Sequence, residues 1–442
     1  MAEPAPPQSA PEVDSTAAHE RATRRTVLLA SLVGTTVEWY DFFLYATAAS
    51  MVFNHVFFPS KNPTLGTLLS FATFAVGFVM RPIGGFVFGH VGDRIGRKRS
   101  LALTMLLMGT ATSLMGALPT AAQVGVLAPI LLLALRIIQG FALGGEWAGA
   151  VLLAVEHSPE KRRGIYGSTP QIGLALGLAL GTGAFALLQV LLPEHAFLRY
   201  GWRIAFLVSV VLVIFGLVVR LRVAETPAFQ AIYARSERSA VPLCEVFVPP
   251  VLRSTVLGML ARWGEGAAFN TWGVFAIAYA TGTLRLAKIP VLSAVTLAAL
   301  IMAVLLPVSG RLTDRFGARA VYGTGLALFG LTVFPVFALF GNRSIIWFTV
   351  GMVWAFGVVH AWFYGAQGTL FASLFPTRVR YTGLSTVYQL SGVYASGITP
   401  LILTGLIAAG HGGPWYACTY LAMTAAISVG ATVLLKPSAS ET

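Results

Sequence analysis

Long apolar stretches recur from one end of the chain to the other, and they constrain the fold more than any other feature. About 20 helical residues are enough to cross the roughly 30 Å hydrocarbon core of a bilayer, and each stretch reaches about that length or more. The predicted spans are residues 26–53, 65–88, 100–118, 124–155, 165–192, 202–221, 252–280, 289–309, 320–340, 344–374, 382–409 and 414–435. The sequence therefore predicts an all-α membrane protein with twelve transmembrane helices.

The composition agrees with a membrane protein and argues against nucleic-acid binding. The chain is 56% hydrophobic and only 11% charged, whereas a soluble domain is about one quarter charged. The net charge of +13 comes from basic residues in short polar breaks between apolar stretches, not from one basic face. The two cysteines, Cys244 and Cys418, support neither a disulfide framework nor a metal site. We expect no metal and no cofactor.

The distribution of Lys and Arg predicts the orientation. With the N-terminus in the cytoplasm, 21 of the 30 basic residues fall on the cytoplasmic side, 6 fall on the outer side and 3 lie within spans. Cytoplasmic loops of membrane proteins carry such an excess. Residues 1–25 begin without a signal peptide and are predicted to form a disordered cytoplasmic tail. We expect a multi-pass protein of the cell membrane with both termini cytoplasmic.

An internal repeat divides the chain into two halves. The segment "GHVGDRIGRK" starts at Gly89 and "GRLTDRFGAR" starts at Gly310, 221 residues later. Parallel six-helix repeats of this kind occur in some secondary transporters. The predicted organisation is a six-helix bundle over 26–221, a cytoplasmic linker over 222–251, a second bundle over 252–435 and a tail over 436–442.

Carboxylates inside the predicted helices are candidates for proton coupling. Glu38 and Asp41 are three residues apart in "VEWYDFF" and share a helix face with Tyr45. A carboxylate at the bilayer centre costs roughly 2.5–3.5 kcal/mol on insertion scales, so its presence suggests a function. The alternative is a structural ion pair or hydrogen bond to a neighbouring helix. Glu146 is a third candidate, and pairing with a loop arginine is its alternative role.

Three arginines inside the predicted helices are candidates for substrate binding. Arg81 and Arg136 lie in the N-terminal half, and Arg262 lies in the C-terminal half. A guanidinium keeps its charge when buried and offers a planar pair of donors to a carboxylate. Arg81 is also close enough to the cytoplasmic loop to reach water, and Arg262 could be neutralised by Glu265, three residues later.

Further polar residues are predicted to line a cavity between the halves. The substrate-binding candidates besides the arginines are Tyr45, Glu265, Asn270, Tyr388 and Gln389. His360, Tyr364 and Gln367 are further polar residues that could line it. His360 is the weakest of these candidates, because a single histidine in an apolar helix is more often a core residue than a proton relay.

Several motifs resemble those of the major facilitator superfamily and, within it, the metabolite:proton symporter family. They are "GTTVEWYDFFLY" at 34–45, "FVMRPIGG" at 78–85, "GHVGDRIGRK" at 89–98, "RIIQGFALGGEWAGA" at 136–150, "VEHSPEKRRG" at 155–164 and "FPTRVRYTG" at 375–383. The resemblance implies the major facilitator fold and is greatest to the shikimate-permease branch. Permeases for α-ketoglutarate, citrate and proline/betaine belong to the same family.

The resemblance also implies a cytoplasmic gate in the loop after the second helix. The residues concerned are Gly89, Asp93, Arg94, Gly96, Arg97 and Lys98, with Asp314 and Arg315 in the second copy. The second copy has Ala318 where the first has Arg97. This difference leaves open whether the second loop also gates.

The expected function is proton-coupled import of a small carboxylate such as shikimate by alternating access. Its partners are that carboxylate, protons and membrane lipid, and the family expectation is a monomer. A proton-coupled efflux antiporter and a symporter of zwitterionic osmolytes are the alternatives. No clustered nucleophile, metal site or nucleotide-binding loop points to an enzyme.

Overall fold

The structure is a computed structural model, and it describes residues 12–95, 97–144, 146–156, 158–222, 245–249, 251–376 and 379–436. Within these ranges the side chains of residues 12–31, 63, 89–101, 153, 156, 160 and 220–222 are not described. The predicted linker therefore lies mostly outside the described residues, and so do the side chains of Gly89, Asp93, Arg94, Arg97 and Lys98; Gly96 is outside entirely.

The N-terminal half is a bundle of upright helices. Its long members are α1 (Glu12–Met51), α3 (Pro63–Ile95), α4 (Arg97–Ala117), α6 (Leu127–Leu143), α7 (Trp147–Glu156), α8 (Arg163–Leu191) and α10 (Trp202–Arg222). Short elements connect them: α2 (Phe53–Val56), α5 (Ala121–Val124), η1 (Glu160–Arg162), α9 (Glu194–Ala196) and η2 (Phe197–Gly201). Helix α1 begins well before the apolar stretch that starts at residue 26, so this residue marks the start of the apolar segment and not of the helix.

The C-terminal half repeats the arrangement, with several helices interrupted by π-helical turns. Its long helices are α13 (Val251–Asn270), α15 (Lys288–Phe316), α16 (Ala318–Gly341), α17 (Ile345–Met352), α18 (Ala361–Ala372), α19 (Arg380–Ser391), α20 (Thr399–Ala409) and α21 (Trp415–Leu434). The π-helical turns are η3 (Thr271–Phe275), η4 (Tyr279–Thr283), η5 (Val353–His360) and η7 (Gly392–Gly397), and the three-residue α14 (Ala276–Ala278) lies between two of them.

Each predicted span coincides with one or more observed helices in the described ranges, although α1 begins earlier than its predicted span. There, nine helices are long and apolar enough to cross a membrane. The other three predicted spans correspond to α1, to α4 with its apolar part Ala102–Ala117, and to α13 with the turns that follow it. The all-α membrane fold with two six-helix halves is confirmed.

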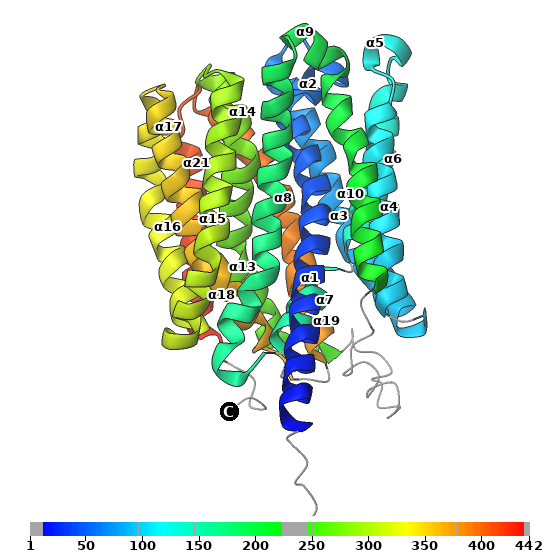
Figure 1. The fold of residues 1–442 in the computed structure, drawn as a ribbon. Helices are drawn as coiled ribbons and strands as arrows, with labels where there is room; N and C mark the ends of the chain where they lie inside the picture. Colours follow the sequence, from blue (N-terminus) through cyan, green and yellow to red (C-terminus); the bar gives the residue numbers. More distant parts are fainter. Residues whose placement is uncertain are drawn as a thin grey trace, which may run out of the picture.

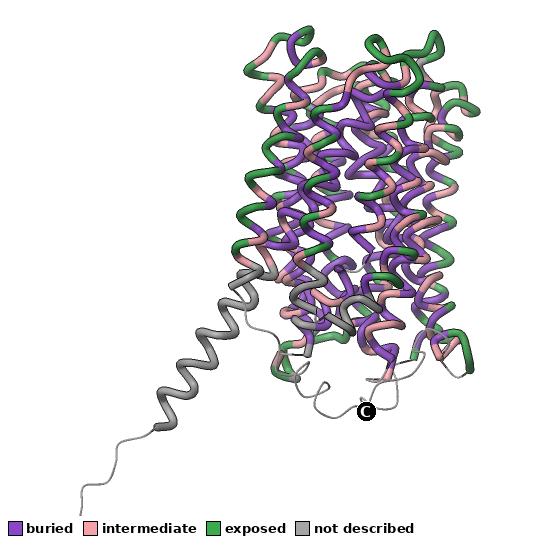
Figure 2. The backbone as a smooth tube through the Cα atoms, turned by 90° about the vertical axis from the view of Figure 1, so that its right-hand side faces the viewer, coloured by how far each residue is buried: buried purple, intermediate pink, exposed green. Residues whose placement is uncertain are grey.

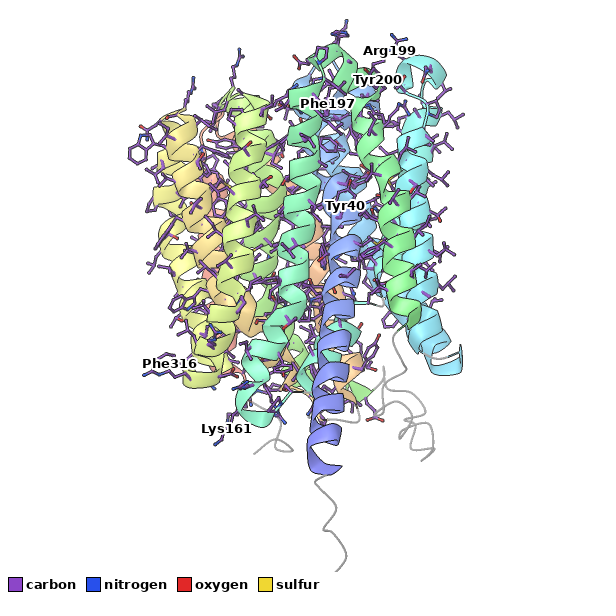
Figure 3. All side chains as sticks on the ribbon, in the orientation of Figure 1. Tyr40, Lys161, Phe197, Arg199, Tyr200 and Phe316 are labelled. Carbon is purple, nitrogen blue, oxygen red and sulfur yellow. The ribbon has the colours of Figure 1, made fainter. Side chains whose placement is uncertain are left out.

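The helices stand side by side in one bundle (Figure 1). Helix α1 begins and α21 ends at the same end of the bundle, which we call the terminal end, and we call the opposite end the distal end. Lys161 and Phe316 lie at the terminal end, whereas Arg199 and Tyr200 lie at the distal end (Figure 3).

The bundle presents apolar side chains outward as well as inward. Buried residues occupy the inward-facing turns, and exposed ones follow the outer surface (Figure 2). Many of the exposed residues are large and apolar: Val211 is 66% exposed, Val304 72% and Leu331 76%. Contiguous exposed apolar surface on this scale is rare in soluble proteins and is the surface that lipid chains cover.

The two halves meet along two pairs of helices. Helix α8 runs beside α15, and α3 runs beside α19, η7 and α20. Along the first pair, Gly164 and Gly310 bring the two backbones into close contact near the terminal end. Nearer the distal end the hydroxyls of Thr182 and Thr296 lie 2.7 Å apart.

Within the N-terminal half, α3 and α6 cross at glycines. A Cβ added to Gly84 would collide with the carbonyl of Phe141, and one added to Gly144 would collide with the carbonyl of Arg81. Small residues at such crossings allow the close backbone packing that holds membrane helices together. This crossing also fixes Arg81 relative to α6.

We predict that Gly84→Ala lowers thermal stability in detergent, because the added methyl group overlaps a backbone carbonyl that cannot rotate away. Overpacking of this kind costs about 1–3 kcal/mol. Thermal unfolding followed by tryptophan fluorescence measures the effect. Gly430→Ala on α21 is the matched control, since nothing lies within 4 Å of its added Cβ. Equal midpoints for the two variants would contradict the prediction.

Candidate functional site

A small cavity lies between the two halves. Its lining comes from the N-terminal half through Trp39, Phe42, Phe78, Arg81 and Leu174, and from the C-terminal half through Arg262, Glu265, Phe269, Asn270, Tyr364, Tyr388 and Ser396. Its free volume is about 10 Å³, which is room for about one water molecule. The halves must move apart before an organic molecule fits.

Arg81 places a buried cation on the N-terminal side of the cavity. Its side chain is 3% exposed, and its guanidinium carbon lies 4.0 Å from the ring centre of Phe78 and 4.7 Å from that of Phe42. Cation–π contacts stabilise a charge placed over such rings. Its Nη2 atom makes no hydrogen bond within the described structure. A buried donor without an acceptor is costly, so this atom is suited to an anionic ligand.

Arg262 places a second cation on the opposite side. Its Nε atom lies 3.4 Å from Oε2 of Glu265, one turn later on α13. Its Nη1 donates to Ser391 Oγ at 3.0 Å, and its guanidinium carbon lies 3.8 Å from the ring centre of Tyr388. The cavity is thus lined by two guanidinium groups and one carboxylate.

Contacts between the halves close the cavity toward the terminal end. The ring of Trp147 stacks on that of Tyr388, with ring centres 3.6 Å apart and planes inclined by 13°. Next to this pair, Gln389 Nε2 donates to the carbonyl of Gly144 at 2.6 Å. Trp147 and Gly144 belong to the N-terminal half, and the other two residues belong to the C-terminal half.

The cavity is closed toward the distal end as well. Ser50 Oγ donates to the carbonyl of Val274 at 3.1 Å, which joins α1 to η3. The ring of Phe43 lies 5.3 Å from that of Phe269. At the distal surface, Lys288 and Glu194 form an ion pair at 2.6 Å, which is exposed and therefore contributes little to stability. The structure is occluded on both sides.

Asp41 is buried in the N-terminal half and does not line the cavity. It is 1% exposed and accepts a hydrogen bond from Ser209 Oγ on α10. Gln139 Nε2 donates to Thr112 Oγ1 at 2.8 Å and lies 3.4 Å from the backbone oxygen of Asp41. No ion pair to this carboxylate occurs among the described side chains, so its charge lacks a direct counter-ion there.

Gln139 links Asp41 to Arg136. The Nη1 atom of Arg136 donates to Oε1 of Gln139, and its guanidinium carbon lies 4.0 Å from the ring centre of Tyr45. Tyr45 in turn donates to Thr73 Oγ1 at 2.7 Å. This polar cluster lies within one half of the molecule. The structure therefore separates Arg136 and Tyr45 from the cavity lining, where the sequence placed them.

The other predicted residues take different positions. Glu38 is buried but is not part of the lining. Glu146 accepts a hydrogen bond from Thr104 Oγ1. Gln389 closes the cavity from its terminal side instead of lining it. Gln367 Nε2 lies 3.4 Å from Oε2 of Glu265, and His360 packs among aromatic rings, 4.7 Å from that of Phe363.

Sequence reasoning missed most of the aromatic lining. Trp39, Phe42 and Phe78 belong to motifs that were recognised, but an aromatic residue in an apolar helix carries no signal that separates the cavity from lipid or core. The stacking of Trp147 on Tyr388 joins residues far apart in the chain. Gln139 could have been predicted from the sequence, because it follows Arg136 by one helical turn.

The second copy of the repeated loop motif contacts the opposite half. Asp314, near the end of α15, accepts hydrogen bonds from the backbone N–H groups of Gly164 at 2.6 Å and Ile165 at 3.2 Å. These groups belong to the first turn of α8, where N–H groups have no partner within the helix. A carboxylate at this position also interacts favourably with the helix dipole. Arg315 is exposed and lies over Phe316.

We predict that Asp314→Ala loosens the contact between the halves at the terminal end, because the first turn of α8 loses its acceptor. Spin labels at Lys161→Cys and Arg319→Cys, in a protein lacking Cys244 and Cys418, report the separation by electron–electron resonance. The distance distribution should broaden and extend to longer values. Arg311→Ala removes another exposed charge from α15 and is the control. An unchanged distribution in Asp314→Ala would show that this contact does not hold the halves together.

The family model and the relatives that match this chain are all transport proteins. Residues 26–247 match the family model "Sugar (and other) transporter". The chain is 40% identical over 392 residues to the inner membrane metabolite transport protein YhjE of Escherichia coli (strain K12), covering 87% of this chain and 88% of the relative. It is 39% identical over 418 residues to the shikimate transporter of the same strain, covering 94% and 95%.

A relative of lower sequence identity and a solved structure also match this chain. The proline/betaine transporter of Salmonella typhimurium is 33% identical over 403 residues, covering 89% of this chain and 80% of the relative. A structure of the major facilitator superfamily proton:xylose symporter XylE superimposes with a TM-score of 0.75 at 15% identity, covering 94% of this chain and 95% of the other. The chain is therefore a multi-pass membrane transporter that belongs to the sugar (and other) transporter family of the major facilitator superfamily.

Proposed function

We propose that this transporter imports a small carboxylate, such as shikimate, together with a proton. The observation that carries the proposal is the pair of buried guanidinium groups of Arg81 and Arg262, one from each half, on a single cavity whose lining holds one carboxylate. Two buried guanidinium groups on one cavity favour the binding of an anionic ligand. The 39% identity to a protein named as a shikimate transporter supports this substrate class.

The position of the site suits alternating access. Arg81 moves with the N-terminal half and Arg262 moves with the C-terminal half, so an anion held between them stabilises the closed state. Trp147 and Tyr388 separate when the terminal end opens, and Ser50 and Val274 separate when the distal end opens. We place the terminal end in the cytoplasm, because most basic residues are at that end of the predicted spans.

Asp41 is the favoured proton carrier. A buried charge without a counter-ion costs several kcal/mol, and a proton on this carboxylate removes that cost. Its carboxylate accepts a hydrogen bond from Ser209 on α10, which connects the protonation state to the packing of α1 against α10. Glu38 and Glu146, which are also buried, are the other candidates.

We predict proton-driven uptake of shikimate into proteoliposomes. Labelled shikimate should accumulate when the outside is acidic, and a protonophore should abolish accumulation. One proton carried with a monoanion moves no net charge, so an inside-negative membrane potential drives uptake only if a second proton travels with the substrate. Outward movement of an added apolar cation in exchange for protons, without shikimate uptake, would favour the efflux antiporter.

We predict that Arg81→Ala lowers shikimate uptake at least tenfold, because a buried charge-assisted hydrogen bond contributes about 1.5–3 kcal/mol. Arg81→Lys should recover only part of this loss, since an ammonium group cannot make the same planar contact. Initial uptake rates over a range of concentrations give the affinity. Arg199→Ala, which removes an exposed arginine at the distal end, is the control and should match the wild type.

We predict that Asp41→Asn separates transport from proton coupling. Exchange of labelled for unlabelled shikimate across the membrane needs no net proton movement and should persist. Accumulation against a gradient should be strongly reduced. The two assays on the same proteoliposomes distinguish this result from simple unfolding. Retained accumulation in Asp41→Asn would assign the coupling proton to another group.

A zwitterionic substrate is the second candidate. Glu265 and the rings of Trp39, Phe269 and Tyr364 line the same cavity as the arginines, and aromatic rings with a carboxylate can hold a quaternary ammonium. The 33% identity to a proline/betaine transporter supports this alternative. Inhibition of labelled shikimate uptake by excess betaine or proline would favour it, whereas inhibition by other small carboxylates alone would favour the carboxylate.

A further inference from the structure

We propose that Glu265 and the carboxylate of the substrate compete for Arg262, so that a proton on Glu265 and an anion on Arg262 bind together. This inference rests on the proposed function and deepens it. It gives Glu265 a role distinct from that of Asp41: proton binding at Glu265 sets the affinity for substrate inside the cavity.

The ion pair between Arg262 and Glu265 is incomplete. Its two closest atoms are 3.4 Å apart, yet Nε of Arg262 makes no hydrogen bond within the described structure. Ser391 and the ring of Tyr388 hold the guanidinium in place from the other sides. A substrate carboxylate therefore meets a fixed guanidinium with an open donor, and it can form the paired hydrogen bonds that Glu265 does not form.

The cavity lining offers no second carboxylate that could bind the proton in place of Glu265. Gln367 is its hydrogen-bonding neighbour at 3.4 Å. Glu265 is the one carboxylate of the cavity lining. The titratable or charged groups around it on α3, α13, η5, α16, α18 and α19 are Arg81, Arg262, His360, Tyr322, Tyr364 and Tyr388.

Electrostatics determines the sign of the coupling. A substrate anion at Arg262 lies beside the carboxylate of Glu265, and two negative charges at contact distance in a buried site repel each other strongly. A proton on Glu265 removes the repulsion and releases Arg262 to the substrate. By linkage the effect is reciprocal: the bound anion increases the affinity of Glu265 for the proton by the same factor.

Binding of shikimate to the purified full-length protein in lipid nanodiscs tests the proposal. Affinities are measured by calorimetry at pH 6 and pH 8, a range in which a carboxylic acid with an ordinary pKa stays ionised. We expect the wild type to bind about tenfold more weakly at pH 8, within the usual range for coupled sites. In Glu265→Gln, which mimics the protonated carboxyl, the two affinities should agree within about twofold.

Two comparison variants locate the effect. Glu194→Gln changes an exposed carboxylate outside the cavity, and it should keep the dependence of the wild type. Arg199→Ala should keep it too, because Arg199 is exposed and is not part of the cavity lining. Wild-type protein should also take up protons when shikimate is added in weakly buffered solution at pH 7, and Glu265→Gln should take up none.

Each outcome decides between the claims. If Glu265→Gln binds shikimate with the same pH dependence as the wild type, the competition is wrong and the proposed function still stands. If wild-type protein binds neither shikimate nor other small carboxylates, the proposed function fails first. If Glu265→Gln does not fold, the wild type and Glu265→Asp decide, and the absence of proton uptake on shikimate binding to both overturns the inference.

Discussion

The cost of placing charge in a membrane governs this structure. Asp41, Arg81, Arg136, Arg262 and Glu265 are each at most 3% exposed and lie in membrane-spanning helices. None of them can face lipid cheaply, so each must lie against another helix, another charge or an aromatic ring. The helices arrange themselves around these groups, and the outer surface is left to apolar side chains.

The buried charged side chains occupy two locations that differ in their surroundings. Arg81, Arg262 and Glu265 meet at the boundary between the halves, where relative movement changes their environment. Asp41 and Arg136 lie within one half, joined through Gln139. Groups at the boundary are suited to hold a substrate, whereas groups inside a half are suited to connect protonation to packing.

The closed form depends on small contacts at both ends of the site. The Trp147–Tyr388 stack and the bond from Gln389 to Gly144 close the terminal side, and Asp314 completes the first turn of α8 from the opposite half. At the distal side the links are the hydroxyls of Ser50, Thr182 and Thr296. Contacts between neutral groups or with a helix end contribute about 1 kcal/mol each, so few must break for either side to open.

The sequence by itself determined the twelve helices and the two-fold plan, because an apolar run long enough to span lipid has one stable conformation there. It also identified the buried charged residues, because a charged side chain within an apolar membrane span is costly in free energy and therefore rare. Five of the eight predicted substrate-binding residues line the cavity: Arg81, Arg262, Glu265, Asn270 and Tyr388. Only the tertiary structure decided that Arg136 and Tyr45 face inward within one half, and that Trp147 meets Tyr388. Helical spacing gives the face that a side chain shares with its neighbours, but the rotation of each helix against its partners depends on packing across the whole bundle.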